Sequence, residues 1–115
     1  MNEETGQLPK AWCKTVASIL KEAKPGTVFI RQRARRDWAS LTSCPFDSAL
    51  REVLADALGT EGLKGKKHYM DEPGETHSFI FRYGDSPLYT KINLTSQNQI
   101  VIVYFAHRPL KGEDL

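Results

Sequence analysis

The last third of the chain restricts the fold most, because three β-type runs follow one another with short connections. Residues 76–83 and 88–94 alternate apolar and polar side chains, which is the period of a strand with one face in a core. Residues 99–107 are apolar on both faces, as is typical of a strand in the middle of a sheet. Turn-forming residues occupy 84–87 and 95–98. The pattern predicts an antiparallel meander of three strands.

Two earlier segments have the apolar spacing of amphipathic helices. In residues 9–24 the apolar side chains recur at i, i+4, i+7, i+8 and i+11, between an opening proline and a Pro-Gly pair. The second segment follows Pro45, which suits the first helical position, and ends before Gly59. Its apolar stripe, which we expect to be buried, consists of Phe46, Ala49, Leu50, Val53, Leu54, Ala57 and Leu58.

The remaining segments are less regular. Residues 27–30 are β-branched and predict a short strand that pairs with the run at 99–107. The arginine-rich residues 33–41 either continue this strand or form a short helix, and we favour a helical turn around 34–40. Residues 60–75 have no periodicity and several glycines, which predicts a loop.

Together these patterns predict an α+β fold, with two to three helices packed on one face of a small antiparallel sheet that ends in the meander. A chain of 115 residues has room for a single domain, expected at 9–110, with flexible segments at 1–8 and 111–115. The longest apolar run, 100–106, is far shorter than the roughly 20 residues of a membrane span. The acidic start also lacks the apolar stretch of a secretory signal, so we expect a cytoplasmic protein without membrane contact.

The cysteines and histidines predict neither a metal site nor a cofactor. The three histidines lack the i, i+4 spacing of a helical zinc site, and no CxxC pair is present. Cys13 and Cys44 are better explained as small buried side chains than as nucleophiles. No glycine-rich phosphate loop follows a strand.

Charge is more informative by position than in total. The net charge of +2 is too small to identify a nucleic-acid-binding protein. Basic residues nevertheless cluster at 31–36 and 64–68, while acidic residues gather elsewhere, so the chain is able to present a basic face. The alternative is that each cluster is ordinary solvated surface. The candidate RNA-binding residues are Lys64, Lys66, Lys67, Arg33, Arg35, Arg36 and Arg108.

A possible reaction site lies on the polar face of residues 88–94. Tyr89 and Lys91 share this face, where a phenol is able to act as an acid and a lysine to offset charge on a phosphate. His107 ends the next run, and an imidazole is suited to act as a base or an acid near neutral pH. RNA fits such a site, since its 2′-hydroxyl permits cleavage without a metal. An ordinary solvent-facing strand would carry the same residue types.

The order of these features resembles the motility quorum-sensing regulator (MqsR) type of bacterial toxin, within the RelE-like ribonuclease fold. The resemblance spans roughly residues 10–108. It includes a Tyr-x-Lys strand at 88–92 and an apolar strand that reaches Phe105. Those toxins are small mRNA interferases, and each is blocked by an antitoxin protein that is encoded next to it. The resemblance implies that Tyr89 is a functional tyrosine with Lys91 beside it, and that Lys64 or Lys66 is the lysine after the long helix.

The chain departs from that family in two places. The family has lysines after the phenylalanine, where this chain has His107 and Arg108, and it has a glutamine on the first meander strand, where Arg82 is the nearest polar residue. Our leading hypothesis is a metal-independent endoribonuclease that cleaves single-stranded RNA, with Tyr89, Lys91, His107 and Arg82 at its site. The alternative is a non-catalytic nucleic-acid- or protein-binding domain of a bacterial regulatory or toxin–antitoxin system, because a shared fold does not carry activity.

Overall fold

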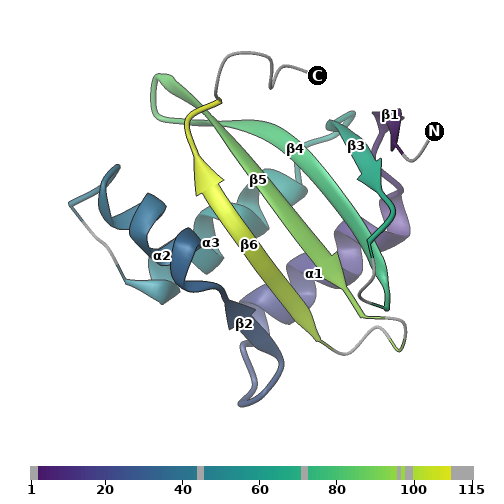
Figure 1. Cartoon of the computed structure of the whole chain (residues 1–115), viewed down its shortest axis with the longest axis horizontal. Coiled ribbons are helices and arrows are strands. Elements are labelled where there is room, and N and C mark those ends of the chain that lie inside the picture. Colours follow the sequence, from purple (N-terminus) through teal and green to yellow (C-terminus); the bar gives the residue numbers. More distant parts are fainter. Residues whose placement is uncertain (1–2, 44–45, 71–72, 96, 98–99, 110–115) are drawn as a thin grey trace.

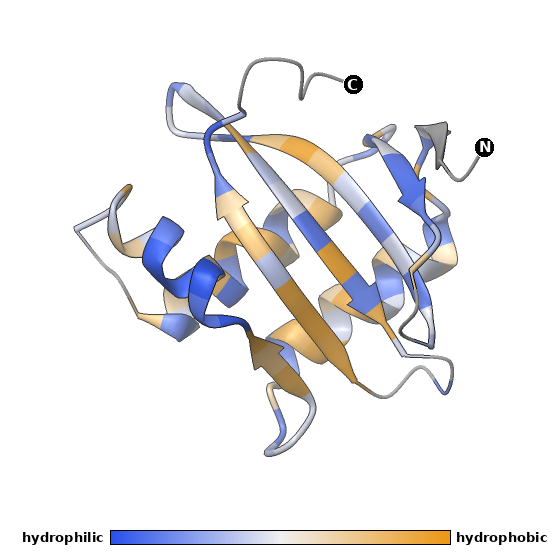
Figure 2. Ribbon diagram, viewed as in Figure 1, coloured by the Kyte–Doolittle hydropathy of each residue, from blue (hydrophilic) through white to orange (hydrophobic). Residues whose placement is uncertain are grey.

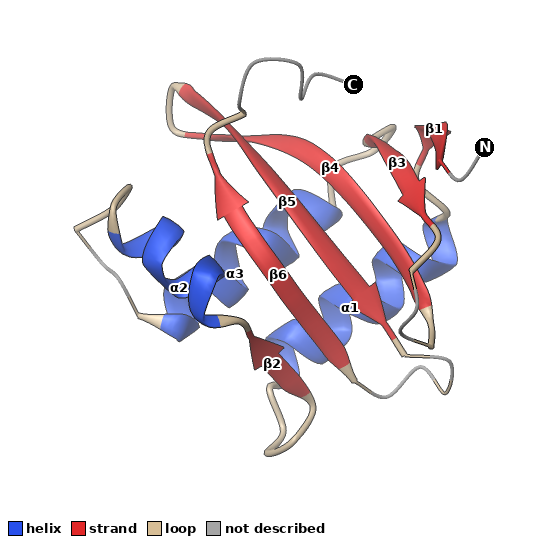
Figure 3. Cartoon of the chain, in the orientation of Figure 1, coloured by secondary structure: helices blue, strands red, loops and turns tan. Residues whose placement is uncertain are grey.

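The computed structural model describes residues 3–43, 46–70, 73–95, 97 and 100–109, which form one sheet and three helices (Figure 1). The strands lie in the order β1-β3-β4-β5-β6-β2, and all neighbours are antiparallel except β2, which is parallel to β6 (Figure 3). In chain order the elements are β1 (Glu3–Gln7), α1 (Lys10–Glu22), β2 (Val28–Ile30), α2 (Gln32–Ala39), α3 (Asp47–Leu58), β3 (Lys64–His68), β4 (Glu75–Tyr83), β5 (Ser86–Leu94) and β6 (Val101–His107).

The helices α1 and α3 lie side by side behind the sheet, and α2 runs along the edge beside β2 and β6 (Figure 1). The predicted α+β class, with its helices on one face and its meander of β4, β5 and β6, is therefore confirmed. The core fills the space between the two layers. Its fully buried side chains include Val16, Leu20, Leu50, Leu54, Phe79, Ile92, Val101 and Val103.

The opposite side of the sheet, which we call the open face, carries no helix of the described part of the chain (Figure 1). Alternation along the strands decides which side chains it presents. On β5, Leu88 and Ile92 point into the core, so Tyr89 and Lys91 point to the open face, as the sequence predicted. None of the described helices has the length and apolar character that a membrane span requires.

The predicted helices and the short strand β2 are also present. The arginine-rich segment is helical, since α2 begins at Gln32, and β2 pairs with β6 as expected. In α3 one residue of the expected stripe is placed differently, because Phe46 is the N-cap with extended backbone and is 68% exposed. Pro45 and Cys44 lie outside the described residues.

The structure differs from the prediction in two segments. Residues 1–8 were expected to be flexible, yet Glu3–Gln7 form β1, and the predicted loop at 60–75 contains β3. Neither strand alternates apolar and polar residues, which is why the sequence did not indicate them. Backbone pairing to β1 on one side and β4 on the other holds β3 in place. Gly65 permits this packing, since a Cβ atom there would clash with the Leu8 side chain and the Ser78 carbonyl oxygen. The predicted flexible end at 111–115 lies outside the described residues.

Candidate functional site

Three rings from β5 and β6 meet on the open face. The register pairs Tyr89 with His107, and their ring centroids are 5.8 Å apart in an edge-on arrangement. Phe105 lies 5.3 Å from the Tyr89 ring and is stacked on His107 at 4.9 Å. We call these three residues the aromatic cluster. Tyr89 and His107, which the sequence placed on neighbouring strands in unknown register, are therefore brought together.

A β-bulge in β6 accompanies this arrangement. Lys91 pairs with Phe105, whereas the next residue, Ile92, pairs with Val103, so Tyr104 has no partner position on β5. Tyr104 instead contacts cations, since the Lys91 Nζ atom lies 5.7 Å from the centroid of its ring. Lys91 is thus paired in register with Phe105 of the aromatic cluster, while its amine contacts the Tyr104 ring.

The helix α2 adds positive charge to the same region, because it runs beside β6. The Arg33 guanidinium carbon lies 5.0 Å from the Phe105 ring centroid, and that of Arg31 lies 5.6 Å from the Tyr104 ring centroid. Both distances are within the range of cation–π contacts. Figure 2 shows α2 as a hydrophilic helix beside the more apolar β6. The result is a surface on which arginines and aromatic rings alternate.

Asp37 of α2 fixes the end of β6 that carries the aromatic cluster. The strand β2 pairs with β6 only as far as Val103, and no other strand of the described residues pairs with this side of β6 beyond that point. Asp37 fills part of the gap, since its Oδ2 atom accepts a hydrogen bond of 3.3 Å from the backbone N–H of Ala106. The same oxygen lies 4.0 Å from Arg33 Nε. Asp37 therefore links the edge of the strand to an arginine of the site.

The polar atoms of the site differ in accessibility. The Tyr89 ring is mostly buried, with 8% of the residue exposed. Nevertheless, the Tyr89 hydroxyl oxygen is not enclosed, and no group of the described residues forms a hydrogen bond with it. Lys91 forms no ion pair with a carboxylate of the described residues. His107 Nδ1 lies 2.7 Å from the Arg108 carbonyl oxygen, which can only accept, so Nδ1 carries the hydrogen. In a neutral ring Nε2 then carries the lone pair, and this atom is buried.

Arg82 lies apart from the aromatic cluster. It is on β4, two residues beyond Ile80, which pairs with Tyr89, so it faces the same side of the sheet. Its guanidinium group donates a 3.2 Å hydrogen bond to the Asp85 carbonyl oxygen in the turn between β4 and β5. Arg82 is thus held at the turn rather than beside His107.

The predicted RNA-binding residues do not form one patch, and the three lysines already divide between the two faces of β3. Lys66 pairs with Ser78 and faces the open side, as does Lys64, whereas Lys67 pairs with His77, which packs edge-on against Trp12 of α1. Two strands separate β3 from β6, so β3 lies about 14 Å across the sheet from Phe105 and His107, and about 10 Å from Tyr89 on β5.

The arginines also separate. Arg35 forms a bidentate ion pair with Asp47, with nitrogen–oxygen distances of 2.8 to 3.2 Å, and so ties α2 to α3. Arg36 and Arg108 are exposed, and Arg33 lies against the aromatic cluster. Sequence reasoning did not assign Tyr104, Arg31 or Asp37 to the site, because their proximity depends on how α2 docks against β6.

The buried polar groups on the helix side have a structural explanation. His77 Nε2 lies 2.6 Å from Glu75 Oε2, and the Trp12 indole N–H donates a 3.0 Å hydrogen bond to the Glu75 carbonyl oxygen. Burial lowers the pKa of His77 below its ordinary 6.5, and the hydrogen bond to Glu75 opposes this in part. Burial also raises the pKa of the Cys13 thiol, which makes it a poor nucleophile.

Neither a metal-binding cluster among the described residues nor similarity to a known protein defines the site. No group of three or more His, Cys, Asp or Glu side chains within the described residues is arranged to hold a metal ion. Comparison of the chain with protein-family models, curated proteins and solved structures found no match in any of the three.

Proposed function

We propose that this protein is a metal-independent endoribonuclease that cleaves single-stranded RNA on the open face, as toxins of the mRNA interferase type do. The observation that carries the proposal is the pairing of Tyr89 with His107 across β5 and β6, with Lys91 two residues along on the same face. An acid, a base and a cation must reach one phosphate for such a reaction. These three residue types are neighbours here.

In the proposed reaction the RNA supplies its own nucleophile. His107 accepts the proton of a 2′-hydroxyl, whose oxygen forms a bond to the adjacent phosphorus. The bond from phosphorus to the 5′-oxygen breaks, and Tyr89 donates its proton to that leaving oxygen. Lys91 stabilises the additional negative charge on the phosphorane. The products are a 2′,3′-cyclic phosphate and a 5′-hydroxyl, and a proton returns from the base to the acid through solvent.

The surroundings of the aromatic cluster support single-stranded RNA as the ligand. Unpaired bases stack on aromatic rings and on arginine planes, which adds about 1–3 kcal/mol per base. Phe105 with Arg33, and Tyr104 with Arg31, provide two such places next to each other. Paired bases in a duplex are not free to stack in this way, so we expect a preference for single strands.

A second candidate is an RNA-binding domain without catalysis. It is favoured by the burial of His107 Nε2, since a base must reach the hydroxyl whose proton it removes. The stacking and charge on the open face suffice for binding alone. The resemblance to toxins also implies an antitoxin partner. A protein that covers the open face would inhibit RNA cleavage and RNA binding alike.

The test is incubation of an end-labelled single-stranded RNA with the purified protein in EDTA. Catalysis predicts cleavage that leaves cyclic phosphate ends and that falls about 10²- to 10⁴-fold in Tyr89→Phe and in His107→Ala. Tyr69→Phe is the matched control for the phenol, because Tyr69 is an exposed tyrosine outside the aromatic cluster. His68→Ala is the control for the imidazole, with circular dichroism to confirm its fold, because it removes a hydrogen bond to the buried Ser78.

The outcomes separate the two candidates. Undiminished cleavage in Tyr89→Phe would overturn the role of the phenol as acid. No cleavage by the folded wild-type protein, together with RNA binding that Lys91→Gln weakens, would favour the binding domain. If the folded protein neither cleaves nor binds RNA, both functions are excluded.

A further inference from the structure

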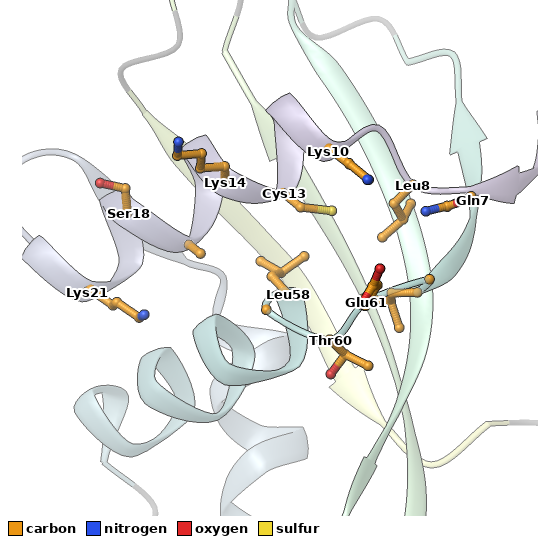
Figure 4. A pocket seen from close by; sticks show the side chains of 14 residues that line it. Gln7, Leu8, Lys10, Cys13, Lys14, Ser18, Lys21, Leu58, Thr60 and Glu61 are labelled. Carbon is orange, nitrogen blue, oxygen red and sulfur yellow. The ribbon is translucent and has the colours of Figure 1, made fainter.

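A pocket of about 560 Å³ lies on the helix side of the molecule, away from the open face. The helix α1 forms one wall, and the end of α3 with the connection to β3 forms the other. Figure 4 shows Cys13 of α1, Leu58 of α3 and Leu8, which precedes α1, gathered around the same space. The volume is within the range of small-molecule binding sites, roughly 300–1,000 Å³.

The floor of the pocket is apolar. Leu8, Cys13 and Leu58 are almost completely buried, and Ala17 and Leu63 are half-buried beside them. Among these five, Ala17 and Leu63 leave the most apolar surface accessible, and a ligand that covered it would gain about 25 cal/mol per Å². A hydrocarbon chain is the simplest group that such a floor would accept.

The rim of the pocket is basic. Lys10, Lys14 and Lys21 lie along one side of α1 at i, i+4 and i+11, so the row is about 16 Å long. None of the three forms an ion pair with a carboxylate of the described residues. The opposite wall carries one acidic side chain, Glu61, so the lining has a net formal charge of +2. A ligand carboxylate is therefore favoured on the α1 side.

We propose that this pocket binds the carboxylate of a medium-chain fatty acid, with the chain on the leucine floor and the head group among the lysines of α1. Charge complementarity selects the anionic head, and the apolar floor selects the chain. The site does not overlap the aromatic cluster, because α1 and α3 lie on the other side of the sheet (Figure 1). Binding here is thus separate from any activity on RNA.

The first experiment is calorimetric titration of the full chain with sodium decanoate at concentrations where it remains monomeric. We expect saturable binding of one decanoate per chain, and at least tenfold weaker binding of decanol and of decyltrimethylammonium, which keep the chain but lack the negative charge. Binding of decanoate should weaken with salt, since the lysines are exposed. No saturable binding by the folded protein would overturn the proposal.

Two variants locate the site. Replacement of Lys10, Lys14 and Lys21 by glutamine should weaken decanoate binding at least tenfold. The matched control, Lys24→Gln, should leave it unchanged, because Lys24 lies beyond α1 and pairs with Glu22 at 3.5 Å. Ala17→Phe should fill the pocket and abolish binding while the lysines stay, with circular dichroism to confirm that each variant is folded. Equal affinity in the triple variant and the wild type would overturn the proposal.

A third readout uses the cysteine of the floor. Alkylation of Cys13 by N-ethylmaleimide is expected to be slow, because the thiol is buried and its pKa is raised. In a Cys44→Ser background, and with excess reagent, decanoate should slow it at least threefold further, whereas decyltrimethylammonium should not. Unchanged alkylation at saturating decanoate would mean that the fatty acid binds elsewhere. Binding to phosphatidylglycerol vesicles without binding of decanoate would mean that the lysines meet a lipid surface, and would also overturn the pocket proposal.

Discussion

Replacement of Asp37 by alanine tests how the end of β6 is held. The backbone N–H of Ala106 lies on the side of β6 where β2 no longer pairs, and the Asp37 carboxylate accepts its hydrogen bond at 3.3 Å. Ala106 is fully buried, so the alanine variant leaves a buried donor without a partner, which costs about 1–3 kcal/mol. The contact of Asp37 with Arg33 adds little, because the arginine side chain is 58% exposed and the 4.0 Å pair is screened by solvent.

The assay is urea denaturation followed by circular dichroism. We expect Asp37→Ala to lower the free energy of unfolding by about 1–3 kcal/mol, and Asp37→Asn to lower it less, because the amide oxygen still accepts the hydrogen bond. Asp56→Ala on the exposed side of α3 is the control and should stay within about 0.5 kcal/mol. The reasoning fails if Asp37→Ala also stays within that limit. Equal losses in the alanine and asparagine variants would show that charge, not hydrogen bonding, is what matters.

Four further predictions concern the core, the sheet, the pH dependence and the site. Leu54→Ala should cost about 2–5 kcal/mol in urea denaturation, because Leu54 is fully buried in α3, and a change within error would mean that its surroundings collapse without loss. Gly65→Ala should cost about 1–3 kcal/mol through the clashes with the Leu8 side chain and the Ser78 carbonyl oxygen, and an unaffected midpoint would show that β3 moves away from both without loss. Folding lowers the pKa of His77 below 6.5, so below that pH the unfolded chain binds more protons than the folded chain. The free energy of unfolding should therefore fall as the pH decreases through 6.5. His77→Phe should flatten that part of the profile, and an unchanged profile would assign it to other groups. Arg33→Gln should reduce the slope of log K for RNA against log salt by about 0.7, whereas an unchanged slope would place Arg33 away from the phosphates.

The parts of the fold that follow from burial were predictable. The strands β4 and β5 alternate because one face of each lies against α1 and α3, and that period of two is legible in the sequence. The helix α3 has the same kind of signal, since Leu50, Leu54 and Leu58 share its buried side. Even α2, with four charged side chains in eight residues, was suggested as a helix, but its direction along β6 was not.

The strands that are held by backbone pairing without an alternating apolar pattern, β1 and β3, were not predictable. The strand β3 reads Lys-Gly-Lys-Lys-His, a sequence without alternation and with poor strand propensity. It is a strand because β4 offers an edge on one side and β1 adds one on the other. Such pairing supplies hydrogen bonds to any sequence, so it leaves no apolar pattern to detect. The signal that remains is Gly65, whose missing side chain makes room for Leu8.

The candidate site depends on one extra residue in β6, the bulge at Tyr104, which the sequence also does not indicate. Val101 and Val103 of β6 are buried against the helices, so unbroken alternation would also turn Phe105 and His107 into the core. The bulge at Tyr104 shifts the register by one, and Ala106 takes the buried position instead. This shift puts His107 opposite Tyr89 and Phe105 opposite Lys91 on the open face. A one-residue change in register exchanges the two faces of a strand, so the chemistry available on the open face is determined by where the bulge forms. No periodicity in residues 99–107 marks that position, because the run is apolar on both sides of it.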